Sequence, residues 1–343
     1  MGVFDFVKIF RVNKSISIDL GTANILIYDK QRKKIVLNEP SVVARDRKTG
    51  RLIAVGKEAR EMLGKTPDSI QAIKPLQDGV IADIDSTKEM ITYFIHKIYG
   101  NSLFKPEVMI CVPIEVTSVE RKALFDAVKG AKKTYIIEEG RAAIIGSGVD
   151  ISQPEGSMVI DIGGGSTDIA ILSLDEIIAS KSIRIAGNRF DEDIVRYVKR
   201  KYNLLIGDRT AEKIKKELGS ALKVQSPEVM EIKGRDLETG IPNTVEVNAN
   251  EIYEAIEDSL FQIVNSTKEV LEKCPPELAA DILDNGIAMT GGGSLIRNFI
   301  DMMEKEVGIK VFLSPNPLDS VVLGGGAAFD NKKLLRTLQM KEN

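Results

Sequence analysis

The sequence predicts an α/β protein built from two related domains. Strand-like runs alternate with helical patterns along most of the chain, which is typical of α/β architectures. One strand–turn–strand pattern occurs twice, about 140 residues apart, which indicates two domains of similar design. A chain of 343 residues with 43% apolar residues is too long for one ordinary core and long enough for two.

The repeated pattern consists of a strand, an aspartate, a glycine turn and a second strand. Its first copy covers residues 15–29, SISIDLGTANILIYD, and its second contains residues 160–172, IDIGGGSTDIAIL. Glycines weaken the interior of a strand. We therefore interpret Gly21 and the glycines at 163–165 as sharp turns, or as places where the backbone approaches another group closely.

Strands and three helices are expected between the two copies. The first helix should stop at Gly64. The second should have Ser86 as its N-cap and stop at Gly100, and the third should have Ser118 as its N-cap. The predicted strands are 34–46, 51–56, 107–115 and 134–140, and the predicted helices are 57–64, 86–100 and 118–131.

The second half of the chain is predicted to be mainly helical around a few strands. Residues 229–248 form two strands with a polar, glycine-containing connection, which predicts a small hairpin. The long helix 249–274 is closed by Pro275 and Pro276. Further helices are expected at 191–202 and 208–222, and a strand, glycine loop and helix at 286–307.

The composition excludes several function classes. Lys and Arg number 47 against 50 Asp and Glu, a net charge of −3, so nothing in this balance indicates a nucleic-acid partner. Cys111 and Cys274 lack metal-site spacing and fit a reducing compartment. His96, the single histidine, lies in a helical pattern and leaves no material for a histidine triad. No apolar run is long enough to span a membrane, and we expect a cytoplasmic protein.

Four glycine-rich segments follow strand-like runs, at Gly21, 163–165, 291–293 and 324–326. Exposed backbone amides at such turns form concavities that bind anions, and phosphate is the leading candidate. The segments are not a P-loop, because no G-x-x-x-x-G-K-[ST] occurs. They are not a Rossmann fingerprint either, because the glycines of the first two segments precede strands.

An aspartate precedes each of the first two turns, Asp19 in DLGTAN and Asp161 in DIGGGSTD. Two carboxylates can hold a hydrated magnesium ion while backbone amides hold the phosphates. The alternative is a set of tight hairpin turns with solvent-exposed aspartates. The sequence therefore predicts a site for a magnesium-bound phosphate compound.

Five motifs resemble, in order, the phosphate 1, connect 1, phosphate 2, adenosine and connect 2 motifs of the actin, Hsp70 and sugar kinase superfamily. They are DLGTAN, IIEEGRAAIIGSG, DIGGGSTDIAIL, AMTGGGSLIRNF and VVLGGGAAFD. Intervening segments such as NEPSVVA and GDRTAEKIKKELGSA are similar to the MreB family of bacterial actins, and the resemblance extends from about residue 15 to about residue 330.

The resemblance implies an actin-like ATPase fold, V-shaped, with two RNase H-like domains that each carry a smaller inserted subdomain and with nucleotide in the central cleft. Domain I is expected at 15–145 and is completed by 315–343, with its insert at about 33–65. Domain II is expected at 146–314, with its insert at about 182–248.

The resemblance also implies the ligands, ATP or ADP with Mg²⁺. Asp19 and Asp161 would organise the magnesium ion. Glu212 and Lys215, three residues apart on one helix, would hold the ribose and adenine; without the resemblance, a surface ion pair is the simpler interpretation. The nucleotide-binding residues implied by position are Thr22, Ala23, Asn24, Gly163, Gly164, Gly165, Glu212, Lys213, Ile214, Lys215, Gly291, Gly292, Gly293 and Ser294.

For hydrolysis, the family pattern implies that Glu139 and Thr167 position the attacking water. Such positioning is most of what phosphoryl transfer requires of a protein. Glu138 is the competing carboxylate. Gly140 and Arg141 replace the proline and methionine that are usual in the family, which indicates a divergent paralogue. We expect Gly140 to loosen the turn that aims Glu139, so that hydrolysis is slow or differently regulated.

Two apolar segments are candidates for contact with a membrane surface. Residues 1–14 have apolar residues at helical spacing between charged ones, which predicts an amphipathic segment that lies either on a membrane or on the protein's own core. The segment YGNSLFKP exposes an apolar pair between polar neighbours. Nearby lysines and arginines suit an anionic surface. The residues expected to contact lipid are Val3, Phe6, Val7, Phe10, Leu103 and Phe104.

The resemblance implies a homopolymer of paired antiparallel protofilaments at the inner face of the cell membrane, which governs cell shape, with other cytoskeletal or membrane proteins as further partners. One alternative is a filament scaffold with weak or no hydrolysis, used for helical shape or swimming in a wall-less bacterium. Another is a small-molecule kinase, although the sequence shows no aspartate-bearing insertion for an acceptor pocket. A chaperone of the Hsp70 type is disfavoured because no substrate domain follows residue 343.

Overall fold

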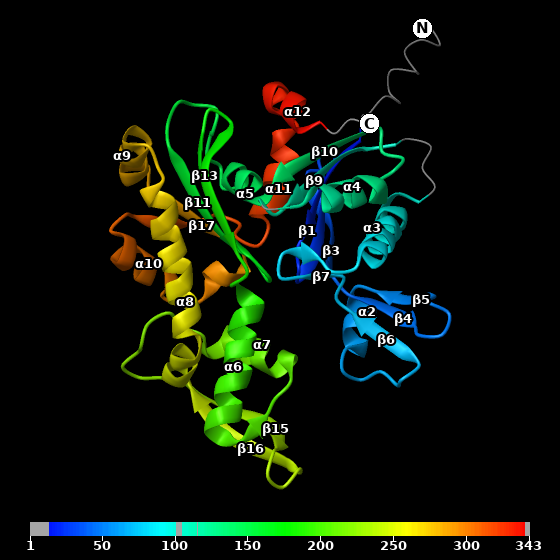
Figure 1. Ribbon diagram of the computed structural model, residues 1–343, viewed down its shortest axis with the longest axis vertical. Coiled ribbons are helices and arrows are strands. Elements are labelled where there is room, and N and C mark those ends of the chain that lie inside the picture. The colour runs from blue at the N-terminus through cyan, green and yellow to red at the C-terminus, as the bar shows by residue number, and fades with distance from the viewer. Residues whose placement is uncertain (1–13, 101–104, 115, 340–343) are drawn as a thin grey trace. The chain divides into compact units, whose positions relative to one another are not determined.

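The computed structural model describes the chain from residue 14 to residue 339, except for residues 101–104 and residue 115 (Figure 1). The predicted α/β class is confirmed, because helices accompany two five-stranded sheets. The chain divides into two compact units, and each unit contains one of these sheets. Unit 1 consists of Met1–Val112, Val116–Glu138 and Val321–Asn343, and unit 2 of Pro113–Glu115 and Glu139–Ser320.

The sheet of unit 1 has the strand order β10-β9-β1-β2-β3. Its central strand β1 runs antiparallel to β2, through the predicted turn at Gly21, and parallel to β9. Ile16, Ser17 and Ile18 are all fully buried, so both faces of β1 are covered. The strands are β1 (Ser15–Leu20), β2 (Asn24–Asp29), β3 (Lys34–Pro40), β9 (Glu107–Val112) and β10 (Lys133–Glu138).

Helix α3 (Ile84–Tyr99) begins earlier than the sequence predicts. Its N-cap is Asp83 rather than Ser86, and the Asp83 carboxylate accepts a hydrogen bond from the Ser86 amide at 2.9 Å. A carboxylate at a helix N-terminus also gains from the helix dipole, which explains why the aspartate is the cap. The predicted stop is confirmed, since Gly100 follows the helix with a φ of 59°.

Helix α4 (Ser118–Ala127) has Thr117 as its N-cap, one residue before the predicted Ser118. The Thr117 hydroxyl accepts a hydrogen bond from the Glu120 amide, and the Glu120 carboxylate accepts one from the Thr117 amide at 2.9 Å. This reciprocal capping box needs a glutamate three residues after the cap, and only Thr117 satisfies that spacing.

The glycines at 324–326 were predicted to form a loop, and this prediction is wrong. They lie inside helix α11 (Ser320–Ala328). A Cβ added to Gly325 would lie 2.2 Å from Ser17 Oγ, and one added to Gly326 would lie 2.5 Å from Tyr28 Cδ1. The glycines therefore allow a helix to approach strands β1 and β2 closely, and they do not form a turn.

A small sheet with the order β5-β4-β6 follows β3 in unit 1. At its β4–β5 connection, Asp46 Oδ1 accepts hydrogen bonds from the amides of Lys48 and Thr49 and from the Thr49 hydroxyl. The remaining elements of unit 1 are β4 (Val43–Asp46), β5 (Leu52–Val55), α2 (Lys57–Met62), β6 (Ile70–Ile73), β7 (Leu76–Gln77), β8 (Val80–Ile81) and α12 (Lys332–Leu338).

The sheet of unit 2 has the strand order β13-β12-β11-β17-β18. Each strand has a counterpart in unit 1, since β11 pairs antiparallel with the next strand along the chain and parallel with a later one, as β1 does. The predicted duplication is thus present in the topology. The strands are β11 (Ser157–Ile162), β12 (Thr167–Ser173), β13 (Glu176–Ile183), β17 (Ile287–Thr290) and β18 (Val311–Leu313).

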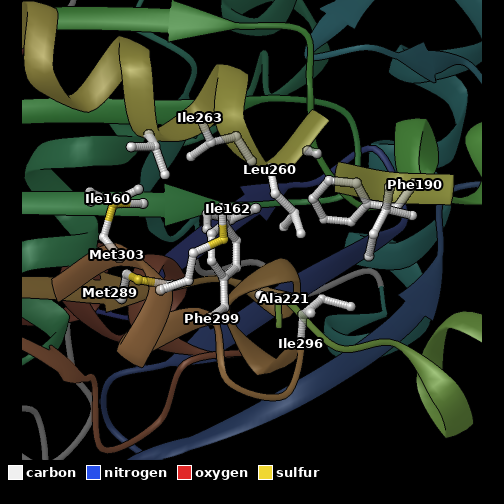
Figure 2. Close-up of a cluster of buried hydrophobic side chains, with 14 of the residues drawn as sticks. Ile160, Ile162, Phe190, Ala221, Leu260, Ile263, Met289, Ile296, Phe299 and Met303 are labelled. Atoms are coloured by element: carbon white, nitrogen blue, oxygen red, sulfur yellow. The ribbon is translucent and has the colours of Figure 1, made fainter. Parts of the chain in front are cut away.

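One continuous apolar core holds unit 2 together. Figure 2 shows Ile160 and Ile162 of β11 among side chains of α8 (Ala249–Glu272) and α10 (Phe299–Val307), including Leu260 and Phe299. All four of these side chains are fully buried. Ile162 is the last residue of β11, so its buried side chain fixes the start of the turn that follows this strand.

The other elements of unit 2 include the predicted helices and hairpin, but the strand predicted at 134–140 ends at Glu138, helix α5 begins at Glu139, and helix α9 was not predicted. Helix α8 ends before Pro275, as predicted, and its N-cap is Asn248. The hairpin β15–β16 pairs with the short β14. The elements are α5 (Glu139–Gly146), α6 (Gly187–Tyr202), β14 (Leu204–Leu205), α7 (Asp208–Leu218), β15 (Val229–Asp236), β16 (Pro242–Asn248), α8 (Ala249–Glu272), α9 (Pro276–Asn285), η1 (Gly292–Leu295) and α10 (Phe299–Val307).

Candidate functional site

The turn of unit 1 lies at the carboxyl end of β1, between the paired residues Leu20 and Ile25. A Cβ added to Gly21 would lie 2.6 Å from Asn24 O, so a side chain at this position is incompatible with the turn. Ser41 supports the turn from the end of β3: its hydroxyl donates to Gly21 O at 2.6 Å and its amide donates to Ala23 O at 3.0 Å. These bonds direct the carbonyls of the turn toward Ser41.

The other predicted residues of this turn differ in exposure. Thr22 is buried, and its hydroxyl accepts a hydrogen bond from the Gly79 amide at 3.3 Å. Ala23 is exposed, and Asn24 is half-buried. Asp19 lies in β1, where its register partners are Leu26 of β2 and Cys111 of β9. The carboxylate therefore belongs to the central strand of the sheet, two residues before the glycine.

The turn of unit 2 lies between the paired residues Ile162 and Thr167 and has the same length. The Gly163 amide closes it by donating to Ser166 O at 2.9 Å. The first amides of α6 support it, because Gly187 donates to Gly163 O at 3.1 Å and Asn188 donates to Gly164 O at 2.7 Å. Within the part of the chain that the structure describes, the amides of Gly164 and Gly165 have no protein acceptor.

The glycine loop after β17 packs directly against the turn of unit 2. A Cβ on Gly291, which has a φ of 80°, would lie 2.6 Å from Asp161 Oδ1. A Cβ on Gly293 would lie 2.2 Å from Ile162 Cγ2. The structure thus brings together the predicted metal ligand Asp161, the predicted phosphate turn and the predicted adenosine loop. Ser294 is buried, and its hydroxyl donates to Gly291 O at 2.6 Å.

Helix α7 carries the predicted nucleoside residues. Ile214 is fully buried in the core, whereas the Lys213 side chain is 62% exposed. The Glu212 carboxylate accepts a hydrogen bond from Lys216 at 2.6 Å. Lys215 points inward instead: its ammonium donates to Gly187 O at 2.7 Å and to Asp191 Oδ2 at 2.9 Å. Both acceptors belong to α6, whose first turn supports the turn predicted to bind phosphate.

A family model described as MreB/Mbl protein matches residues 13–337 of the chain. The chain belongs to the MreB/Mbl protein family. The cell shape-determining protein Mbl of Bacillus subtilis is 49% identical over 321 residues, 93% of this chain and 96% of that protein. The cell shape-determining protein MreB of Escherichia coli is 47% identical over 326 residues, 93% of this chain and 94% of that protein.

Solved structures agree with this assignment. MreB5 of Spiroplasma citri bound to ADP has a TM-score of 0.88 and 39% identity, covering 94% of this chain and 98% of that one. The same protein bound to AMPPNP has a TM-score of 0.89. The MamK double helical filament is 21% identical with a TM-score of 0.79, over 93% of this chain and 99% of that one, which shows the fold alone. The actin-like fold predicted for this MreB/Mbl chain is confirmed.

The two candidate catalytic residues of this MreB/Mbl chain lie in unit 2. Glu139 is the first residue of α5 and is half-buried. Thr167 begins β12 and is fully buried, and its hydroxyl donates to Ile185 O at 2.6 Å. Because its proton is already donated to this carbonyl, the Thr167 hydroxyl can only accept a hydrogen bond from a water molecule, unless the side chain rotates.

The predicted loosening of the turn after Glu139 is not found. Gly140 lies in α5, where an added Cβ would meet Ala170 Cβ at 3.1 Å and Ile114 Cδ1 at 3.3 Å. Arg141 is buried in the same helix, 3.6 Å from the Glu176 carboxylate. In this family member, glycine allows close packing of α5 against β12, which holds the start of the helix in place.

Sequence reasoning missed three residues that shape the site. Ser41 and Gly187 support the two turns, and Asp168 faces Asp161 across β11 and β12. Asp168 is 1% exposed, and its carboxylate accepts a hydrogen bond from the Ile114 amide at 3.3 Å. The available signal for Asp168 was a charged residue inside an otherwise apolar strand, a pattern that is unusual for a buried position.

Several predicted features of the MreB/Mbl chain concern metals and membranes. Among the described residues, no group of three or more His, Cys, Asp or Glu could hold a metal ion. The same residues include no helix that is long and apolar enough to cross a membrane. The candidate lipid contacts Val3, Phe6, Val7, Phe10, Leu103 and Phe104 lie outside the described residues.

Proposed function

We propose that this chain is an ATPase that binds ATP or ADP and polymerises into cytoskeletal filaments that govern cell shape. The observation that carries the proposal is the pair of turns, one in each unit, that follow an aspartate at the carboxyl end of a central strand. In both turns, neighbouring groups bind the carbonyls, which leaves amides to face an anion. MreB5, 39% identical, has been solved with ADP and with AMPPNP.

The proposed phosphate ligands are the backbone and side chains of the two turns. Thr22, Ala23 and Asn24 act from unit 1, and Gly163 to Gly165 act from unit 2. The amides of Gly164 and Gly165 are suited to this role, because a backbone N–H is a fixed donor and the glycines let an oxygen approach. Because ATP carries a γ-phosphate, it provides more acceptors for these donors than ADP does.

Adenosine is proposed to contact α7 and the loop after β17. Glu212 accepts ribose hydroxyls, and the backbone of Gly291 to Gly293 contacts the base. Lys213 has the exposure that a direct contact needs. Ile214 and Ser294 are buried and act by fixing the backbone of their elements.

We propose that Asp19 and Asp161 hold a magnesium ion. Magnesium in nucleotide sites keeps several waters and uses one or two carboxylates plus phosphate oxygens, so a set of three or more acidic ligands is not required. Asp161 is 5% exposed and lies beside the Gly291 loop. The ion supplies neutralisation of phosphate charge when it is bound.

For hydrolysis, we propose that Glu139 accepts a proton from the attacking water and that Thr167 fixes the position of that water. The start of α5 holds Glu139, and the close packing at Gly140 keeps that start rigid. Thr167 is tied to Ile185 O, so the hydroxyl must leave this acceptor before it donates to water.

A filament scaffold with weak hydrolysis is the second candidate, and the same Thr167 bond favours it. Phosphate release by the wild type and by Glu139→Ala distinguishes the two. The ATPase proposal expects a loss of roughly 100-fold in the variant, because general-base catalysis contributes at least that much. Equal slow rates in both proteins would assign the scaffold role, with nucleotide binding retained.

We propose homopolymer filaments of paired antiparallel protofilaments at the inner face of the cytoplasmic membrane, with contacts from residues 1–14 and from Leu103 and Phe104. Electron microscopy of the protein with Mg-ATP, with and without anionic liposomes, tests this arrangement. Straight paired filaments on lipid are expected. A thermal-shift assay with Mg-ATP tests binding itself, and no stabilisation at millimolar ligand would remove the proposal.

A further inference from the structure

We propose that Arg297 is a positioning residue that connects the carboxyl end of α7 to the glycine loop after β17, and so fixes the spacing of the two elements proposed to contact adenosine. The inference rests on the proposed nucleotide function and adds a residue to it. Its basis is one guanidinium group that binds two consecutive carbonyls at the end of α7, which are 78 and 79 residues away in the sequence.

The Arg297 guanidinium binds three acceptors at once. Its Nη2 donates to Leu218 O at 3.1 Å, and its Nε donates to Gly219 O at 3.2 Å. Its Nη1 donates to the Glu228 carboxylate at 2.6 Å. Leu218 is the last residue of α7, and Gly219 is its C-cap. Carbonyls at the end of a helix lack an intrahelical donor and carry the negative end of the helix dipole, so a guanidinium stabilises this end of α7.

The backbone around Arg297 joins the same two segments. The Ala221 amide donates to Arg297 O at 2.7 Å, and a β-bridge pairs Arg297 with Ser220. The Asn298 side-chain amide donates to Ser220 Oγ at 2.9 Å. These bonds place the chain that follows α7 alongside the chain that follows the glycine loop. The guanidinium therefore extends a contact that the backbone has already fixed.

Apolar packing brings the same segments into direct contact. Figure 2 shows Ala221 and Ile296 in one buried cluster with Phe299. A Cβ added to Gly219 would lie 3.0 Å from Ile296 Cδ1, so the end of α7 lies against this isoleucine. The Ile296 amide donates to Gly293 O at 3.3 Å, which connects the contact to the glycine loop. Movement of the end of α7 is therefore transmitted to the loop within a few residues.

Both connected elements carry residues proposed to contact the nucleoside, Glu212 and Lys215 on α7 and Gly291 to Gly293 in the loop. Lys215 O accepts the amide of the C-cap Gly219 at 2.9 Å, so Lys215 lies one turn from the Arg297 contacts. A site whose parts are already fixed loses less conformational entropy on binding. Loss of Arg297 should therefore weaken binding through the nucleoside, which ADP and ATP share, and leave the added contribution of the γ-phosphate unchanged.

The test measures dissociation constants of Mg-ADP and Mg-AMPPNP by calorimetry for the wild type and for Arg297→Met, which keeps an unbranched side chain without its donors. We expect both ligands to bind roughly 10-fold more weakly, the scale of one lost hydrogen bond to a charged group. The ratio of the two dissociation constants should stay within about twofold of the wild-type ratio. A residue that only stabilised the fold would leave both affinities unchanged at a temperature well below unfolding.

Matched variants separate the bonds to α7 from the ion pair. Glu228→Gln removes the charge of a partner whose side chain is 55% exposed, and should change both affinities by less than about twofold. Arg196→Met removes an arginine that pairs with Asp193 of the same helix, α6, and should bind both ligands as the wild type does. Arg297→Lys keeps the charge but lacks the planar group that binds two carbonyls, so it should recover part of the affinity and covers the case in which Arg297→Met does not fold.

Three results would overturn the assignment. Unchanged affinity for both ligands in whichever Arg297 variants fold would show that the bonds to α7 have no influence on the site. A larger loss for AMPPNP than for ADP would place the effect at the γ-phosphate and not at the nucleoside. An equal loss in Glu228→Gln would assign the effect to the ion pair. Failure of the wild type to bind either ligand is a different result, because it removes the proposed function and not only this role of Arg297.

Discussion

The turns of the two units have the same length and the same strand pairings, but different elements support them. In unit 1, the hydroxyl and amide of Ser41 bind the turn carbonyls. In unit 2, two backbone amides at the start of α6 bind them. Ser41 follows β3 and α6 follows β13, so the support comes from the equivalent place in each sheet. The comparison shows that backbone geometry is repeated more faithfully than the chemistry that stabilises it.

The difference has a consequence for coupling. The support in unit 1 is a single residue beside a strand, whereas the support in unit 2 is a helix that Lys215 of α7 also contacts. Only the second arrangement, among the described residues, connects a proposed phosphate-binding turn to the helix proposed to contact the nucleoside. Two comparisons of matched variants test this difference, and a third compares a separate pair of similar loops, in order of decreasing expected effect.

The same glycine-to-alanine change should affect the two turns unequally. In Gly21→Ala the new Cβ meets Asn24 O at 2.6 Å, whereas in Gly163→Ala it meets Ser166 O at 3.2 Å. The free energy of unfolding should fall by about 3 kcal/mol in the first variant and by about 1 kcal/mol in the second, by analogy with overpacked interiors. Thermal unfolding measures both.

Gly207→Ala is the control for this pair, because an added Cβ at Gly207 meets no atom within 4 Å. Its unfolding temperature should stay close to that of the wild type. Equal destabilisation by Gly21→Ala and Gly163→Ala would show that the tighter contact at Gly21 has no energetic meaning.

The two supports should also respond differently to loss of a side chain. Ser41→Ala removes the hydroxyl that binds Gly21 O at 2.6 Å and should lower stability by about 1 kcal/mol. Asn188→Ala keeps the backbone amide that binds Gly164 O, so its effect should stay within about 0.5 kcal/mol. Denaturant titration of both variants provides the measurement, and a larger loss in Asn188→Ala would contradict a backbone-based support.

The smallest expected effect concerns two hairpin loops, one in each unit, that share the sequence pattern D-x-x-T-G. Hydrogen bonds from the backbone and then the hydroxyl of Thr49 lower the pKa of Asp46, and those of Thr239 lower the pKa of Asp236. A depressed pKa in the folded state gives stability above the unfolded pKa, near about 3.9, that is lost as the pH falls through the folded pKa.

Asp46→Asn and Asp236→Asn should therefore each reduce the slope of stability against pH below pH ~4, by similar small amounts, because both loops are exposed. Carboxyl NMR titration should place both pKa values below the usual aspartate range. A normal pKa for one loop would show that the two hairpins differ despite their matching hydrogen bonds.

Local chemistry made much of the fold predictable. Alternating strands, an aspartate and a glycine turn predicted the central hairpin of each unit, and these hairpins are confirmed. The predicted N-caps, Ser86 and Ser118, lie shortly after the observed ones, Asp83 and Thr117. Several polar residues near each helix start can serve as caps, so the exact cap is hard to predict. These errors stay small, since capping depends only on neighbours in the sequence.

Long-range contacts account for what the sequence could not show. The glycines at 324–326 look like a turn, and their helical role depends on Ser17 and Tyr28, about 300 residues away. The inward orientation of Lys215 depends on Gly187 and Asp191, which are 28 and 24 residues distant. A spacing of three residues between Glu212 and Lys215 contains no information about those partners.

The close approach of α11 to β1 and β9 also makes Cys111 a reporter of local unfolding. Its thiol is fully buried, and a Cβ at Gly325 would lie 2.9 Å from the sulfur. A maleimide has no path to this thiol until the helix lifts, whereas Cys274 is only partly covered. The rate of alkylation at Cys111 therefore measures how often this helix detaches from the sheet, without any engineered probe.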